Sequence, residues 1–398
     1  MFNSIQIFGM ALLGGLSAGE LSRRVLALPR TSGYVVFGLL LGKSGLGWIA
    51  PYHIESNQIF IDLGLGLILF QLGYEVPPVA VSEGWNRLRA GVLVSLTTVS
   101  SIVLALLALE FSVSSAIFAA TLCLATSPAI TIATCSDVGA KGDKTGVLLT
   151  MVAINGCVAF AASAWSMVFL VDDEGIRSLA GVWKASQEIG GAAVLGGACA
   201  GLVLLAAQVL GRRPEHQHLL ILGTIVLGVG TAIYLDISVY LPMLLFGYMT
   251  RTCDRGKQVV AIRIASDARI FLVATFVLAG AALDIGELFE YWQEALLVVA
   301  ARFAGQMAGV FGNRNRLRLS AESSIYLSIG LQPMSSIALV LLASMQTLYS
   351  GLEPRLTGTL LATILLMQLL GPLATQTAIK GFGEATSLQS NVRQEKDQ

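Results

Sequence analysis

The chain has 398 residues, of which 55% are hydrophobic and only 13% charged, and its mean hydropathy is +0.74. This composition excludes a soluble globular domain and predicts a polytopic membrane protein, while the net charge of zero gives no support to nucleic acid as a partner. No nucleotide-binding loop, nucleophile motif or metal-ligand spacing is present, so the sequence predicts neither an enzyme nor a bound cofactor or metal.

Apolar runs between charged or Pro/Gly-rich breaks predict an all-α chain with about thirteen membrane spans. The spans lie near 5–22, 32–49, 57–75, 90–109, 114–134, 146–171, 188–210, 217–235, 238–250, 268–284, 291–311, 321–346 and 356–378. Several are short or interrupted by glycine, a pattern that is usual in transporters.

The lysines and arginines between these spans predict the orientation of the chain. If the N-terminus lies outside, nineteen of the 25 fall in inner connections or the C-terminal tail, four fall outside, and Arg269 and Arg302 fall within spans. We therefore expect a multi-pass protein of the cell (plasma) membrane with the N-terminus outside and the C-terminus in the cytoplasm.

The fifth and sixth spans carry the polar centre of the sequence. Thr126, Ser127 and Pro128 stand in the middle of the fifth span, and Asn155 and Gly156 stand at a similar depth in the sixth. A proline at mid-depth opens backbone carbonyls that must face protein or a water-filled cavity, and a helix broken there offers its dipole ends and carbonyls to an ion.

Three further sites belong to the same interpretation. The twelfth span has a second break at Gln332-Pro333-Met334, followed by Ser335 and Ser336, whose hydroxyls either face an ion or bond to the preceding turn. Arg302 lies near the middle of the eleventh span, where a buried guanidinium needs acceptors and serves either as a structural brace against helix ends or as a substrate contact. Asp137 follows the first break at the inner mouth and is the first candidate for a proton carrier.

A weak internal repeat links segments that are seven spans apart. LLLG in the second span matches LLFG in the ninth, a Phe-Gly-acid pattern ends both the third and the tenth, and TSPA in the fifth matches QPMSS in the twelfth. An odd offset gives the two copies opposite orientations, which favours inverted repeats with two discontinuous helices that cross at the site.

The segments GYVVFGLLLGKSGLG, LGLILFQLGYEV, ATSPAITIATCSDVGAKGDKTG, FVLAGAALD and AARFAGQMAGV resemble, in this order, conserved segments of the monovalent cation/proton antiporter superfamily, particularly its Kef-type branch. The resemblance runs over all thirteen spans and implies the sodium/proton antiporter fold and exchange of Na⁺ or K⁺ for protons. It also implies one transmembrane domain over 1–380, with a core around spans 3–6 and 10–13, a dimerisation part around spans 1–2 and 7–9, and a short cytoplasmic tail over 381–398.

The resemblance implies an ion site at Thr126, Ser127, Pro128 and Asn155, with Ser335 and Ser336 opposite and Arg302 as charge compensation. The partners that follow are a monovalent cation, protons, the lipid bilayer and a second copy of the chain in a homodimer.

One position departs from this pattern. Gly156 stands where most of the superfamily has an aspartate, which binds either the cation or a proton, and an asparagine amide does not titrate. The alternative is therefore the same fold without proton antiport: an uncoupled cation pathway, an anion or neutral-solute carrier using Arg302, or a non-transporting subunit.

Overall fold

The computed structural model describes residues 3–26, 28–78, 82–170, 179–210, 213–254, 265–335, 338, 342 and 353–385. In these residues the chain forms sixteen helices: α1 (Ser4–Leu26), α2 (Arg30–Leu41), α3 (Pro51–Ser56), α4 (Gln58–Glu75), α5 (Ser82–Ala108), α6 (Val113–Leu124), α7 (Pro128–Asp137), α8 (Asp143–Leu170), α9 (Leu179–Leu210), α10 (Pro214–Tyr234), α11 (Tyr240–Cys253), α12 (Ala265–Ala282), α13 (Ile285–Gly312), α14 (Arg314–Leu317), α15 (Ala321–Gly330) and α17 (Pro354–Phe382).

Within the described ranges, eight helices have the length and apolar composition needed to cross a membrane. Their spans are Ser4–Val25, Gln58–Glu75, Glu83–Ala108, Asp143–Ser163, Ser186–Val209, Pro214–Tyr234, Leu288–Gly312 and Pro354–Phe382. Three shorter apolar helices cover Arg30–Leu41, Val113–Leu124 and Ile270–Ala282. The all-α membrane fold is confirmed, whereas the number thirteen stays a prediction.

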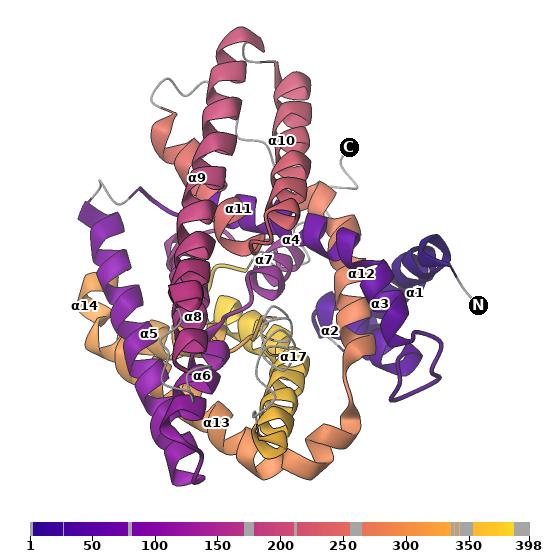
Figure 1. Cartoon of the computed structure of the whole chain (residues 1–398), viewed down its shortest axis with the longest axis vertical. Coiled ribbons are helices and arrows are strands. Elements are labelled where there is room, and N and C mark those ends of the chain that lie inside the picture. The colour runs from indigo at the N-terminus through magenta and orange to yellow at the C-terminus, as the bar shows by residue number, and fades with distance from the viewer. Residues whose placement is uncertain are drawn as a thin grey trace.

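The helices pack in two groups. In one group α5, α6, α8, α13, α15 and α17 pack together with α7, and in the other α1, α2, α4, α9, α10, α11 and α12 pack together. Figure 1 shows α5 and α14 on one side of the molecule and α1, α2, α3 and α12 on the other. We call the first group the core group and the second the scaffold group. The helices α4 and α12, which we expected in the core, pack most extensively against α11 and α2, and α4 also contacts α7 and α8.

Two glycine crossings hold the scaffold group together. A Cβ atom at Gly38 of α2 would lie 1.9 Å from the Val277 carbonyl oxygen of α12, and one at Gly73 of α4 would lie 2.0 Å from the Leu244 carbonyl oxygen of α11. Only glycine permits such close backbone approach. The second span thus pairs with the tenth as the third pairs with the ninth, which is the relation expected from a repeat with an offset of seven spans.

The end of α17 is bonded to the start of α8. The Glu384 carboxylate accepts hydrogen bonds from the main-chain N–H groups of Lys144 (3.0 Å) and Thr145 (2.7 Å), and also from the Thr145 hydroxyl. A carboxylate at a helix N-terminus satisfies free N–H groups and complements the helix dipole. Residues 381–385 of the expected tail therefore belong to the folded core group.

Candidate functional site

The fifth predicted span is broken at the expected place, between α6 and α7. α6 ends at Leu124, and α7 begins at Pro128 with Ser127 as its N-cap, whose side chain accepts a hydrogen bond from the Ile130 N–H at 3.3 Å. Proline is well suited to the first position of a helix because its missing N–H would have no partner there. Thr126, Ser127 and Pro128 are all buried.

The second break crosses the first. After α15 ends at Gly330, the chain continues as an extended segment in which Met334 forms an antiparallel bridge with Thr126. The Ser127 N–H donates to the Pro333 carbonyl at 2.9 Å, and the Ser335 N–H donates to the Ala125 carbonyl at 3.1 Å. The two extended segments thus satisfy each other's main-chain groups at the centre of the core group. Ser335 is buried beside Thr126, and Ser336 lies outside the described residues.

Arg302 of α13 lies against this crossing and is fully buried. Its Nε donates to the Cys123 carbonyl at 2.6 Å, and the remaining guanidinium N–H groups donate to the carbonyls of Leu331 (3.1 Å) and Gln332, with longer contacts to the Gln332 and Thr126 side chains. The carbonyls belong to the C-terminal ends of α6 and α15, which lack partners within their own helices and carry the negative end of the helix dipole.

Gln306 and Gln332 extend the same network. Gln306, one turn after Arg302, donates to the Leu331 carbonyl at 3.2 Å, and the Gln332 amide donates to the Gln306 side chain and to the Ser328 carbonyl at 3.0 Å. Arg302 and Gln306 therefore satisfy the end of α15 together. Gln306 was not predicted from the sequence, although its position four residues after Arg302 places both side chains on one helix face.

Asn155 lies on the other side of Thr126. Its side chain is fully buried, donates to the Thr126 hydroxyl at 3.3 Å and accepts from the Ser95 hydroxyl of α5 at 2.9 Å. The structure thus brings Thr126 and Asn155 together as the sequence predicts, and it adds Ser95. Nothing local in the sequence indicates Ser95, because its partner is 60 residues away.

Gly156, the next residue of α8, faces Tyr240 of the scaffold group. A Cβ atom at position 156 would lie 1.7 Å from the Tyr240 hydroxyl oxygen and 2.6 Å from the ring carbon that carries it. Tyr240, the first residue of α11, thus occupies the space of the absent side chain.

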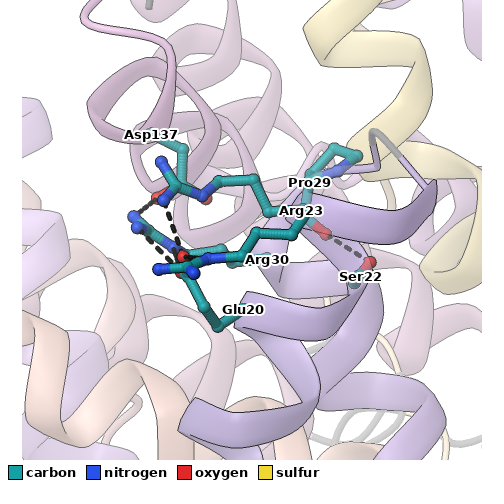
Figure 2. Close-up of polar contacts among 7 residues, drawn as sticks. Glu20, Ser22, Arg23, Pro29, Arg30 and Asp137 are labelled. Atoms are coloured by element: carbon teal, nitrogen blue, oxygen red, sulfur yellow. Dashed lines mark hydrogen bonds and ion pairs between the residues drawn. The ribbon is translucent and has the colours of Figure 1, made fainter. Parts of the chain in front are cut away.

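Asp137, the predicted proton carrier, lies at the end of α7 in an ionic cluster with Glu20 and Arg30. Figure 2 shows the Arg30 guanidinium between two carboxylates: it is 3.0 Å from Asp137 Oδ1 and 3.2 Å from Glu20 Oε2. Arg23 and Arg24 also bond to Glu20. The cluster connects α1 and α2 of the scaffold group to α7, and its central side chains are about one quarter exposed, at 26% for Arg30 and 27% for Glu20.

No group of three or more His, Cys, Asp or Glu side chains that could hold a metal ion occurs within the described part of the chain. Arg302, Thr126 and Asn155 have no carboxylate among their hydrogen-bond partners in the same residues. The crossing of the two broken helices is therefore polar, and the charged group that is hydrogen-bonded to it in the described residues is the Arg302 guanidinium.

Comparisons with known proteins identify the family. A family model described as "Sodium/hydrogen exchanger, transmembrane" matches residues 8–380. The structure of the sodium proton antiporter MjNhaP1 from Methanocaldococcus jannaschii at pH 8 is 21% identical, with 96% of this chain and 99% of that chain covered and a TM-score of 0.68. A 3D EM map of the same antiporter gives 18% identity, coverage of 96% and 98%, and a TM-score of 0.72.

A search of curated proteins gives no match. At these identities the solved structures establish the sodium/proton antiporter fold, with its inverted repeats and two crossed discontinuous helices. The family match covers nearly the whole chain, as expected from the resemblance. The chain is a membrane transporter and belongs to the sodium/hydrogen exchanger family.

Proposed function

We propose that the protein exchanges a monovalent cation, Na⁺ or K⁺, for protons by alternating access at the crossing of the two broken helices. The observation that carries this proposal is the meeting of α6, α7 and the segment after α15 around Thr126, with the buried Asn155 side chain beside it. Hydroxyl, amide and main-chain oxygens are suitable ligands for such cations, and Thr126, Ser127, Pro128, Asn155, Gly156, Ser335 and Ser336 form the proposed site.

The contacts of Arg302 support a cation over an anion as substrate. A guanidinium has five N–H donors, and here all of its nitrogens donate to protein acceptors, most of them helix-end carbonyls. A brace of this kind compensates the dipoles of α6 and α15 and leaves no donor directed at a substrate anion. We therefore assign Arg302 to charge compensation.

A second candidate is cation movement without proton coupling, and the packing of Gly156 favours it. The position that would carry a titrating acid is filled by the neutral Tyr240 side chain, and the amide of Asn155 does not titrate. Coupling would then need a different acid, for which Asp137 is the first candidate.

The purified protein in liposomes containing a pH-sensitive dye separates these two functions. Antiport predicts that a Na⁺ or K⁺ gradient drives dye-reported proton movement, with choline as the control cation. Uptake of radioactive Na⁺ or K⁺ without proton movement at any pH would assign the uncoupled function. Absence of both signals would contradict the proposal.

A pair of variants tests the role of position 156. Gly156→Asp alone brings the new carboxylate against Tyr240, whereas Gly156→Asp combined with Tyr240→Ala provides space for it. If the fold retains the rest of an antiporter site, the double variant shows stronger cation-dependent proton flux than the wild type and than Tyr240→Ala alone. Equal flux in all three proteins would show that position 156 is not part of the site.

We also propose the orientation of the protein in the membrane and its oligomeric state. The distribution of lysine and arginine supports an N-terminus outside and a C-terminus in the cytoplasm of a plasma membrane, and the resemblance supports a homodimer formed through the scaffold group. In this orientation the Arg30 cluster lies at the cytoplasmic end of α7, between the two groups of helices.

A further inference from the structure

The space left by the missing side chain of Gly156, which we call the notch, lies on the boundary between the core and scaffold groups. Gly156 stands near the middle of α8, and the atoms nearest to its missing Cβ belong to the Tyr240 phenol of α11. α11 has 14 residues, a length of about 21 Å, which is shorter than a bilayer core of about 30 Å. Because its first residue touches the middle of α8, α11 begins within the depth of the membrane rather than at its surface.

Neighbouring contacts hold Tyr240 in this position. Its ring is stacked on Phe160, one turn after Gly156, with the ring planes 7° apart and the centroids at 6.2 Å. Its main-chain N–H donates to the Ser238 hydroxyl at 3.2 Å, and the Ser238 N–H donates in turn to the Glu188 carboxylate of α9 at 3.1 Å. The phenol is therefore directed into the notch by its ring contacts and by the start of its helix.

The hydroxyl at the end of this side chain is buried and, among the residues that the structure describes, unpaired. Tyr240 is only 3% exposed, and its oxygen has no hydrogen-bond partner within the described residues. Buried tyrosine hydroxyls usually find a partner, since leaving one unpaired is unfavourable. The oxygen also lies where the first atom of a side chain at position 156 would stand, one residue from Asn155. A ligand bound beside Asn155 would satisfy it.

We propose that the Tyr240 hydroxyl is a ligand of the transported monovalent cation, supplied by the scaffold group in place of a side chain at position 156. This inference rests on the proposed cation transport and specifies its site. The ligands are then neutral oxygens, and they come from both groups of helices: Asn155 and Thr126 from the core group and Tyr240 from the scaffold group. Separation of the two groups of helices removes the Tyr240 ligand and so lowers the affinity for the cation.

The test compares Tyr240→Phe with the wild type by thermal unfolding of the full-length protein in detergent, titrated with NaCl or KCl against choline chloride. A bound cation raises the unfolding midpoint, and the concentration dependence gives its Kd. Loss of one ligand predicts binding about tenfold weaker. Tyr234→Phe, which changes an 87% exposed tyrosine of α10, is the matched control and should bind as the wild type does.

The measurement in choline alone checks the premise. If the hydroxyl is unpaired without a cation, its removal leaves the midpoint in choline unchanged or higher, because no hydrogen bond is lost. A lower midpoint of Tyr240→Phe in choline would show a protein partner and overturn the proposal. Equal cation affinity of Tyr240→Phe and wild type would overturn it while leaving the proposed transport intact. A wild type that responds to neither Na⁺ nor K⁺ would contradict both.

Discussion

The crossing of the broken helices and the Arg30 cluster are both built around an arginine, yet they neutralise it by different means. Arg302 is fully buried and bonds to carbonyl and amide oxygens, whereas Arg30 is partly exposed and bonds to two carboxylates. A carboxylate buried beside Arg302 would itself have to be desolvated, and helix-end carbonyls need partners in any case. The fold therefore places its buried Arg302 charge where main-chain dipoles converge, and it pairs Arg30 with carboxylates where the side chains are partly exposed.

The largest effect on stability is expected from Arg302→Ala. It removes the donors to the Cys123 and Gln332 carbonyls, leaves the Leu331 carbonyl with Gln306 as its donor, and should destabilise the protein by about 3–5 kcal/mol, by analogy with breaking a buried charged network. The stability of Arg302→Lys should lie between that of the wild type and that of Arg302→Ala, because an ammonium group has three N–H donors. The measurement is the unfolding midpoint and the monodisperse fraction of purified protein.

Arg355→Ala is the matched control for Arg302. Arg355 is 47% exposed and is 2.9 Å from the Glu294 carboxylate, so its loss should cost no more than about 1 kcal/mol. If Arg302→Ala proves as stable as this control, the buried hydrogen bonds of Arg302 contribute no more to stability than an exposed ion pair does.

An intermediate effect is expected from Gly156→Ala. The added methyl group would overlap the Tyr240 hydroxyl, and overpacking of this kind costs about 1–3 kcal/mol. In a Tyr240→Ala background the same substitution should cost less. Gly190→Ala of α9, where no atom lies within 4 Å of the new Cβ, is the control and should be neutral or stabilising. An equal cost of Gly156→Ala in both backgrounds would show that Tyr240 is not its obstacle.

The smallest effect on stability is expected from Asp137→Asn. The pair with Arg30 is partly exposed and is worth about 1 kcal/mol or less, and added salt should reduce that further. Its effect on transport is the more informative measurement. Proton flux that persists in liposomes containing Asp137→Asn excludes this residue as the carrier, whereas flux lost from a folded protein, with cation binding retained, supports that role.

The sequence was most informative where a local signal has one structural meaning. Pro128 and Pro333 predicted the two breaks because proline cannot continue a membrane helix without exposing carbonyls. The repeat predicted their crossing, which the bridge between Thr126 and Met334 confirms. Both inferences needed only the hydrophobic pattern and the chemistry of single residues.

Contacts between distant spans could not be predicted in the same way. The resemblance marked Gly156 as missing an acid, but no pattern indicated that Tyr240 would fill the space from another helix. Asp137 was placed near the site because it follows the break closely in sequence, whereas α7 extends away from the crossing and carries it to Arg30 at the opposite end. Distance along a helix axis, at about 1.5 Å per residue, separates residues that appear close in sequence.

The bridge between Thr126 and Met334 has a mechanical consequence. Its two main-chain bonds run between the inverted halves of the fold, and a relative displacement of about 2 Å would break both of them. The two broken helices are therefore hydrogen-bonded to each other at their crossing, and we expect them to move as a single rigid body. In the transport cycle that we propose, sliding then falls on the surfaces where α4, α9 and α11 meet α8 and where α2 meets α7 and α17.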